Sequence, residues 1–480
     1  MMEEKKDYKK IRLKCGLEIH QQLATQQKLF CGCSTTMTEK NPIMILTRKQ
    51  HPVASELGEF DIAAQHEYLR NRNFYYQVFN NESCLVECDE EPPHMLNREA
   101  LETALQVALL LNCSVPNEIH VMRKTIIDGS TTTSFQRTMV VGLNGFLRYK
   151  GEKIEIKHVS LEEDAAAIVK EDESSATFRL NRLGIPLIEV GTGIITDFAP
   201  EEVQDVAYQI GMIIRSTGKS KKGLGTIRQD VNVSVKGGER VEVKGVQELG
   251  ILAKVISLEV ERQLSLPKVA KEVRAALADG NTKFTRPLPG AARMYPETDV
   301  EPVAVDAEYL KKLEENLPES WEVRLKKIKK LKISDQLAEQ IVKSDYVDLF
   351  EKIVKEKNVE ASVVANTFTN TLKDLRREHM PVDNLNDEHF YKIFELLKKR
   401  TIAKEAIHPI LKELAREPDE DVVTIVRNLG LEAITVTELK RIIQEVKGRN
   451  PDATKDKILG LVMSRVRGRI DAKIVVKEVK

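Results

Sequence analysis

The fold of this protein is decided early in the chain by residues 16–23, GLEIHQQL. Leu17 and Ile19 alternate there with Glu18 and His20, and a period of two sends the two pairs to opposite faces of a β-strand. Burial of a carboxylate is costly unless a metal ion or a polar ligand pairs with it. The stretch alone fits two interpretations equally well: one corner of a functional site, or the solvated outer face of an antiparallel sheet.

Length and composition restrict the class of protein. The chain has 480 residues, enough for about two to four domains. Lys and Arg balance Asp and Glu at 74 each, so net charge predicts neither a strong polyanion binder nor an acidic-tail protein. No apolar run approaches the roughly eighteen residues of a transmembrane helix, and the charged start at residues 1–7 is no secretory signal. Six cysteines are too few for a disulfide scaffold, which predicts a cytoplasmic setting.

The sequence predicts an α+β protein with three parts. Residues 1–303 mix short strand patterns with helical patterns at 97–111 and 200–215, so we expect a large N-terminal mixed-sheet domain. Residues 304–417 are rich in Lys, Glu and Leu and poor in glycine, which predicts an all-helical domain. Residues 418–480 begin at a charged hinge and form a small helical tail domain.

Two further acidic segments accompany predicted strands. Residues 162–164 (EED) directly follow one, and their mutual repulsion calls for a cation or for the nearby His158, unless they form a solvent-facing turn. Glu189 lies inside an apolar run and would be a buried carboxylate. Arg182 is a possible partner, so Glu189 belongs either to a site or to a structural ion pair with Arg182.

A predicted hairpin carries polar side chains on one of its faces. Arg228, Asp230 and Asn232 alternate with apolar residues on its first strand, and Glu242 and Lys244 share a face of its second strand. An Asp, an Asn, a Glu and a Lys on one sheet face suit a site for Mg²⁺ and a nucleotide. They suit a water-exposed sheet face equally well.

Six side chains on strands or strand ends together supply hard oxygen ligands and one imidazole: Glu18, His20, Glu162, Glu189, Asp230 and Glu242. Oxygen-rich sets favour Mg²⁺ or Ca²⁺ over zinc. The chain has neither a Walker-type loop nor a Rossmann glycine fingerprint. A nucleotide would therefore bind through a metal ion and scattered basic groups.

Four of the cysteines suggest a separate site. Cys31 and Cys33 are one residue apart, and Cys84 and Cys88 are separated by three. They predict either a four-thiolate zinc cluster or two buried cysteine pairs, since zinc arms usually have gaps of about two to four residues.

The C-terminal segment 455–473 is locally basic. Arg465, Arg467 and Arg469 alternate across a glycine, which suggests guanidinium groups offered to phosphates. A solvated basic surface is the alternative. No aromatic residues interleave, which argues for recognition of nucleic acid by backbone and shape rather than by base stacking.

Six ordered motifs resemble the B/E family of tRNA-dependent amidotransferase subunits, and they are specific and cover nearly the whole chain. The motifs are GLEIH at 16–20, KLFCGC at 28–33, EEDA at 162–165, residues 181–189, DVNVS at 230–234 and EVK at 242–244. The tail at 457–475 is similar to the small helical, YqeY-like domain that ends these subunits. The resemblance implies that residues 1–303 form a cradle-like kinase and amidotransferase domain and that residues 418–480 bind tRNA.

Within the family, segments 52–58, 128–138 and 286–299 resemble the archaeal E branch. Members of this branch usually carry an inserted domain similar to one in bacterial-type aspartyl-tRNA synthetases, expected here between about residues 263 and 273. Residues 264–267 (LSLP) cross that point directly, so the chain is either a natural form without the insert or one from which it has been removed. The Cys84/Cys88 spacing also departs from the Cys-x-x-Cys of zinc-binding B-branch proteins.

The resemblance implies an ATP-dependent ligase of protein biosynthesis that phosphorylates Glu-tRNA(Gln) and amidates the acyl phosphate with ammonia to give Gln-tRNA(Gln). It implies that His20, Glu162 and Glu189 are catalytic and bind Mg²⁺ together with Glu18. Nucleotide-binding roles would fall to Glu18, Lys124, Asp230, Glu242 and Lys244. A glutaminase- or asparaginase-like partner subunit, resembling GatD, would supply ammonia. The alternatives are a B-type subunit of a three-component Asp/Glu-tRNA amidotransferase and a non-catalytic tRNA-binding scaffold.

Overall fold

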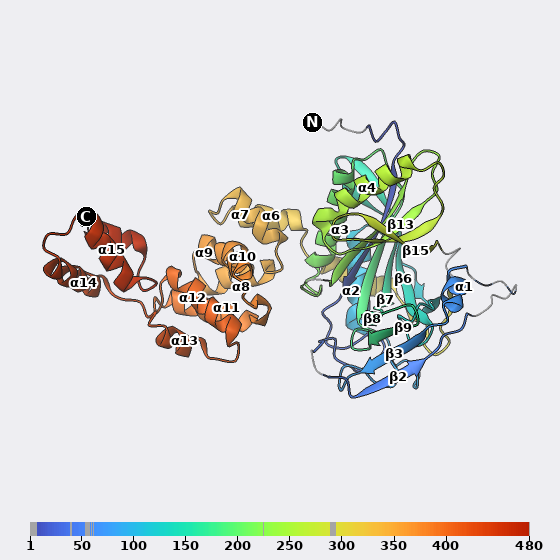
Figure 1. Cartoon of the computed structure of the whole chain (residues 1–480), viewed down its shortest axis with the longest axis horizontal. Helices are drawn as coiled ribbons and strands as arrows, with labels where there is room; N and C mark the ends of the chain where they lie inside the picture. The colour runs from blue at the N-terminus through green and yellow to red at the C-terminus, as the bar shows by residue number, and fades with distance from the viewer. Residues whose placement is uncertain are drawn as a thin grey trace. The chain divides into compact units, whose positions relative to one another are not determined.

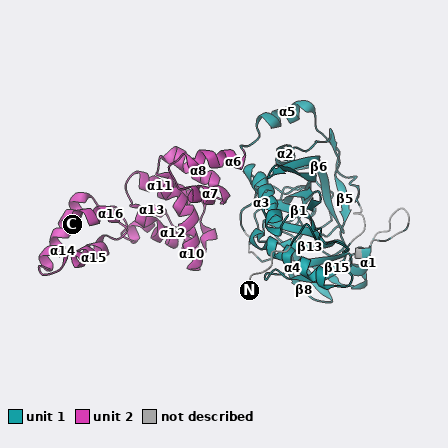
Figure 2. Ribbon diagram, turned by 90° about the horizontal axis from the view of Figure 1, so that it is seen from above, with its two compact units in different colours: residues 1–319 teal, residues 320–480 magenta. Residues whose placement is uncertain are grey.

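The computed structural model describes residues 7–38, 41–52, 58, 60, 62–223, 225–288 and 294–479. It contains two compact units, residues 1–319 and residues 320–480 (Figure 1, Figure 2). The named strands lie in the first unit, and the second is helical, which confirms the predicted α+β class with a large N-terminal mixed sheet. The charged start at 1–6 and parts of two segments discussed above, 53–57 and 289–293, lie outside the described residues.

A large sheet of eleven strands organises the first unit, in the order β15-β14-β13-β12-β1-β10-β7-β6-β5-β16, with β11 also pairing with β1. Its pairings are antiparallel except for the parallel pair β13–β14. The strands are β1 (Lys14–Gln22), β5 (Met122–Thr125), β6 (Phe135–Tyr149), β7 (Glu152–Glu163), β10 (Pro186–Thr192), β11 (Ile195–Thr196), β12 (Ile227–Ser234), β13 (Val241–Val246), β14 (Glu272–Ala276), β15 (Thr282–Pro287) and β16 (Met294–Pro296).

Two smaller sheets complete the unit. One has the order β2-β3-β9-β8, and the other pairs β17 with β4. Their strands are β2 (Met44–Arg48), β3 (Asn73–Val78), β8 (Ala167–Glu171), β9 (Ser175–Arg179), β4 (Glu118–Ile119) and β17 (Val303–Ala304).

Three helices cover one face of the large sheet: α2 (Arg98–Leu110), α3 (Pro200–Ser216) and α4 (Leu252–Ser265) (Figure 1). The first two coincide with the helical patterns at 97–111 and 200–215, and Asn97 caps the first by accepting from the amide of Ala100. Leu17 and Ile19 of β1 are buried in the core under these helices. Because side chains alternate along a strand, Glu18 and His20 are directed to the opposite, polar face.

The remaining helical segments of the first unit are η1 (Leu249–Ile251), α1 (Ile62–Leu69) and α5 (Ala307–Glu315). The chain passes from α4 to β14 through residues 266–271 alone, at the point where the inserted domain would begin. No described helix is long and apolar enough to cross a lipid bilayer.

The second unit is built from short helices with polar N-caps, such as Ser320, Asp421 and Thr435. Its elements are α6 (Trp321–Lys329), α7 (Asp335–Lys343), α8 (Val347–Lys357), α9 (Ala361–Asn366), the π-helical turn η2 (Thr367–Thr371), α10 (Leu372–Arg377), η3 (Val382–Asn384), α11 (Asp387–Lys398), η4 (Lys404–Ala406), α12 (Ile407–Arg416), α13 (Val422–Asn428), α14 (Val436–Arg449), α15 (Lys455–Val466) and α16 (Ala472–Val479). The last three pack around a hydrophobic cluster of their own. The predicted boundaries at 303/304 and 417/418 stay predictions.

Candidate active site

The register of strand β1 brings together acids that are far apart in the sequence. On β12, Asp230 stands opposite Glu18. On β10, Glu189 stands opposite His20. Because directly opposed residues of antiparallel strands point to the same face, these four side chains share the polar face of the sheet.

A first group consists of His20, Glu162 and Glu189, whose ligand atoms lie within 4.8 Å of one another. Polar neighbours fix Glu162: Gln136 Nε2 donates at 3.0 Å and Thr138 Oγ1 at 2.8 Å. The arrangement is built from strands β1, β6, β7 and β10, so its geometry depends on the sheet rather than on loops.

Three basic groups surround the buried carboxylate of Glu189. His158 Nε2 lies 2.9 Å away, His20 Nε2 3.3 Å and Lys124 Nζ 3.8 Å. Burial alone would raise the pKa of Glu189, but Lys124 and the two imidazoles outweigh it and hold this pKa well below its usual range. Glu189 is therefore an ionised acceptor inside the protein.

A second group consists of Glu18, Asp230 and Glu242, again within 4.8 Å of one another. Lys244 Nζ bridges two of them, at 2.8 Å from Glu242 and 3.2 Å from Asp230. Asn232 Nδ2 donates to Glu18 at 3.3 Å. Burial, reinforced by the charge of Glu189, raises the pKa of Glu18. Burial acts in the same direction on Asp230, but Lys244 and His20 lower its pKa overall.

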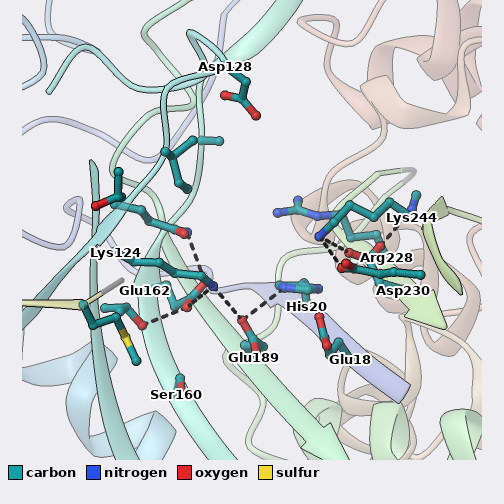
Figure 3. Close-up of a pocket in the computed structure, with 18 of the residues that line it drawn as sticks. Glu18, His20, Lys124, Asp128, Ser160, Glu162, Glu189, Arg228, Asp230 and Lys244 are labelled. Atoms are coloured by element: carbon teal, nitrogen blue, oxygen red, sulfur yellow. Dashed lines mark hydrogen bonds and ion pairs between the residues drawn. The ribbon is translucent and has the colours of Figure 1, made fainter. Parts of the chain in front are cut away.

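Both groups line one cavity of about 630 Å³ (Figure 3). Lys124 approaches from the side of the first group and Lys244 from the side of the second. The wall also contains an apolar part that includes Ile126, Ile127 and Met294. Paired acids with a lysine on each side and an adjoining apolar surface suit a nucleotide held with a divalent cation.

The structure thus brings the eight predicted site residues of the sheet into one cavity: Glu18, His20, Lys124, Glu162, Glu189, Asp230, Glu242 and Lys244. Glu18, expected beside His20 in a single metal site, is grouped instead with Asp230 and Glu242. The alternative partner for Glu189 is not found, because Arg182 donates to the carbonyls of Ala165 and Ala166.

Several lining residues were not predicted as site residues, among them the basic residues His158 and Arg228. His158 lies four residues before Glu162 on β7, and Arg228 lies two residues before Asp230 on β12. The period of two was the available signal for both, because each shares its strand face with a predicted acid.

The cysteine cluster differs from the prediction in its fourth member. Cys31, Cys33 and Cys84 gather with Glu87, within 4.8 Å of one another, and Cys88 is not part of the group. Glu87 accepts from the amide of Cys84 at 2.8 Å, so the turn directs this carboxylate to the thiols. Cys88 packs instead in an apolar cluster. Cys88 therefore lies outside the group formed by the other three thiols, and a zinc site here stays a prediction, as does its alternative of two buried cysteine pairs.

Fold and cavity define an α+β protein with an acidic, lysine-flanked cavity on a mixed sheet. Two families match the chain: the GatB/GatE catalytic domain over residues 13–311 and the GatB domain over residues 348–480. The chain therefore belongs to the GatB/GatE family of tRNA-dependent amidotransferase subunits.

Similar proteins are named as the E subunit of glutamyl-tRNA(Gln) amidotransferase, in agreement with the predicted resemblance to the E branch. The chain is 34% identical to that of Methanocaldococcus jannaschii over 617 aligned positions, covering 98% of each chain. It is 33% identical to that of Saccharolobus solfataricus over 628 positions, covering 99% of this chain and 98% of the relative. The 617 aligned positions exceed the 480 residues of this chain by 137, so at least that many positions of the Methanocaldococcus jannaschii protein have no counterpart here, and an inserted domain does not fit this chain.

Proposed function

We propose that this chain is the E-type subunit of a glutamyl-tRNA(Gln) amidotransferase, an ATP-dependent ligase that makes Gln-tRNA(Gln) from Glu-tRNA(Gln). One observation carries the proposal: two acidic groups, each with its own lysine, share one cavity. The similar proteins cited above bear the E-branch name, which favours this function over a B-type protein. A tRNA-binding scaffold would not need ion-paired carboxylates held at ligand distance in a cavity.

The reaction needs an activation step because a carboxylate is a poor acceptor for ammonia. An oxygen of the glutamyl γ-carboxylate attacks the γ-phosphorus of ATP, and the bond to the ADP oxygen breaks. Ammonia then attacks the acyl carbon, the carbon–oxygen bond to phosphate breaks, and inorganic phosphate leaves with that oxygen and takes up the proton that the nitrogen loses. In the first step negative charge is spread over the oxygens of the transferred phosphoryl group, so cations around the γ-phosphate are required.

The donor set of the cavity fits Mg²⁺, which prefers carboxylate oxygens. His20, Glu162 and Glu189 would hold one ion, and Glu18, Asp230 and Glu242 form the neighbouring acidic wall. His20 supports this fit, because its buried Nδ1 finds no hydrogen-bond partner among the described residues. Bound there, Mg²⁺ would neutralise phosphate charge.

The chain's own residues have separable roles in the proposal. Lys124 and Lys244 stay protonated, since surrounding acids outweigh burial and raise the pKa of each amine, and both can bind phosphate oxygens as point charges. His20 and Glu189 hold each other in place across β1 and β10. The apolar wall around Ile126 and Ile127 excludes water from the reacting groups.

Ammonia and tRNA require parts beyond this cavity. We propose that a separate glutaminase- or asparaginase-like protein supplies ammonia, and that the helical tail, residues 418–480, binds tRNA through its backbone. Arg467 supports the second point, because it follows α15 directly while Arg465 and Arg469 are engaged with Glu445 and the carbonyl of Glu432. Both roles place the chain in the cytoplasm with the protein-synthesis machinery.

The direct test measures ADP formed with ATP, Mg²⁺, Glu-tRNA(Gln) and ammonium chloride. Wild type should turn over only when charged tRNA is present. Glu189→Gln should lose about a thousandfold in rate, because it removes a charged group from the phosphoryl-transfer site. Glu99→Gln is the matched control, since Glu99 lies on α2 in a solvent-exposed pair with Lys219. Full activity of Glu189→Gln would contradict the assignment.

The zinc prediction is narrowed to Cys31, Cys33, Cys84 and Glu87. We propose that these four residues bind one structural zinc ion, since three thiolates and a carboxylate match its ligand preferences. Metal analysis of the full chain should find about one zinc per chain, lost in Cys84→Ser and kept in Cys88→Ser. Retention of zinc in Cys84→Ser would exclude this site.

A further inference from the structure

Arg228 is a cation of the cavity that the proposed function leaves unused. On the sheet it stands opposite His20 and two residues before Asp230, so it shares their face. Figure 3 shows it on the same side of the cavity as Asp230 and Lys244, across from Lys124. Its Nη2 donates a hydrogen bond to Asp164 Oδ1 at 3.1 Å, and the charges of Asp230 and Glu162 act on it as well.

Asp164 is a fully buried carboxylate just behind this arginine. It accepts from Gln22 Nε2 at 2.5 Å and from the amide of Ala165 at 2.9 Å. Arg182 Nε lies 3.7 Å from its second oxygen. The side chain of Asp164 is therefore immobilised by groups from three segments, and a guanidinium bonded to it is held in a fixed direction.

Three basic side chains lie around Asp164, and one of them, Arg228, is also close enough to be affected by the charges of Asp230 and Glu162. Arg182 and Arg228 both face it, and the half-buried Lys221 is near enough to be affected by its charge. Burial lowers the pKa of Arg182, and the charge of Arg228 lowers it further. Arg182 already donates to the carbonyls of Ala165 and Ala166. Arg228 donates to Asp164 through Nη2, so its guanidinium has further N–H donors beside the cavity.

We propose that Arg228 binds phosphate oxygens of the nucleotide in the cavity and that Asp164 positions it for this role. This inference rests on the proposed function and adds a third cation to Lys124 and Lys244. A guanidinium presents a planar fork of donors that matches phosphate geometry, whereas a lysine supplies a point charge. Arg228 touches the substrate and is catalytic in this sense, and Asp164 is a positioning residue.

The test compares the binding of MgADP and of adenosine to the full chain by calorimetry, without tRNA. Arg228→Ala should weaken MgADP about thirtyfold, which is the usual worth of a charge-assisted hydrogen bond. It should leave adenosine binding unchanged, because adenosine has no phosphate. The MgADP affinity of Arg228→Lys should lie between that of wild type and that of Arg228→Ala, since lysine keeps the charge and lacks the planar fork of donors.

The positioning role has its own readout. Asp164→Asn should weaken MgADP about fivefold in the wild-type background and should have no further effect on Arg228→Ala, since both act through one contact. Arg72→Met is the control for loss of a buried ion pair: Arg72 Nη2 lies 2.7 Å from Glu67, away from the cavity, so MgADP affinity should stay unchanged.

Equal losses for MgADP and adenosine in Arg228→Ala, or unchanged MgADP affinity, would overturn the inference. If Asp164→Asn does not fold, the comparison of Arg228→Lys with Arg228→Ala still decides it. Failure of the proposed function and failure of the role of Arg228 are distinguishable, because ADP formation by wild type with Glu-tRNA(Gln) tests the proposed function alone. Wild type that turns over ATP while Arg228→Ala binds MgADP normally would refute only the role of Arg228.

Discussion

The two acidic groups of the cavity use the same strand and the same kind of side chain, yet their charges are balanced differently. In the group of His20, Glu162 and Glu189, a lysine and two imidazoles serve two carboxylates. In the group of Glu18, Asp230 and Glu242, there are three carboxylates, and Lys244 pairs with two of them. The pKa of Glu189 is accordingly lowered and that of Glu18 raised, with burial opposing the first shift and driving the second. The two carboxylates of the first group are compensated by neighbouring bases, whereas the second group has more carboxylates than the one lysine that contacts it can balance.

The largest expected difference between the groups is in catalysis. Glu189→Gln should reduce ADP formation about a thousandfold, and Glu18→Gln about thirtyfold. In the proposal Glu189 binds the Mg²⁺ ion directly, whereas Glu18 belongs to the neighbouring acidic wall. Initial rates at saturating ATP and charged tRNA check this order. The reverse order would mean that the second group holds the ion on which transfer depends.

The free energy of unfolding should change in opposite directions when a carboxylate of each group is neutralised. The pKa of Glu189 lies below its unfolded value, so its contribution is present above that value and lost as pH falls through the folded pKa. The pKa of Glu18 lies above the ordinary 4.5, so its contribution is greatest below 4.5 and lost as pH rises through the folded pKa. At pH 7 Glu189→Gln should lower the free energy of unfolding by about 3 kcal/mol.

Glu18→Gln should instead raise the free energy of unfolding at pH 7, because it removes a buried carboxylate whose charged form is disfavoured in the folded state. The gain should shrink as pH falls toward 4.5, where wild-type Glu18 is itself protonated. Urea denaturation of both variants and wild type at pH 7 and pH 5 measures the two effects. A loss of stability in Glu18→Gln would show that Asn232 already compensates its charge.

A smaller effect is expected from the lysines. Lys244→Met should tighten Mn²⁺ binding to the full chain roughly tenfold, because it uncovers carboxylates that Nζ contacts at 2.8 and 3.2 Å. Lys124→Met should tighten it only about threefold, since its contacts are longer, 3.5 and 3.8 Å. The signal of free Mn²⁺ in electron paramagnetic resonance reports both affinities. Equal changes of Mn²⁺ affinity in the two variants would contradict the proposed difference in charge balance between the two groups.

The smallest effect should come from outside the cavity. Arg467→Ala should weaken tRNA binding about threefold and lower the slope of log affinity against log salt by about one, leaving MgADP affinity unchanged. Arg465→Ala is a matched control, since Glu445 already pairs with Arg465 at 3.6 Å and a smaller change is expected. Filter binding over a salt series would show whether the order holds.

Much of the site follows from periodicity in the sequence. The alternation in residues 16–23 predicts which face of β1 is polar, and the same rule applied to β12 and β13 predicts Asp230, Glu242 and Lys244 beside it. The division into two groups depends on inter-strand register, which turns and bulges set over long distances. That is why Glu18 joins Asp230 rather than His20.

Local turn geometry explains why Cys88 lies apart from the other three thiols. In the segment that starts at Cys84, the amide of Cys88 donates to the carbonyl of Cys84, so the chain folds back on itself. The side chain three residues on, Glu87, then meets the thiols, and Cys88 points into an apolar cluster. The spacing of identical residue types could not show this, because the ligand that completes the group is of another type.

Activation of a carboxylate by phosphorylation is the chemistry on which every role assigned to this cavity depends. Glu-tRNA(Gln) labelled with ¹⁸O in the γ-carboxylate gives a direct test, with full-length chain, ATP, Mg²⁺ and ammonium chloride. We expect one ¹⁸O to appear in inorganic phosphate for each Gln-tRNA(Gln) formed, and Glu189→Gln to abolish the transfer. Gln-tRNA(Gln) formed without ¹⁸O in phosphate would show that the carboxylate is not activated in this way.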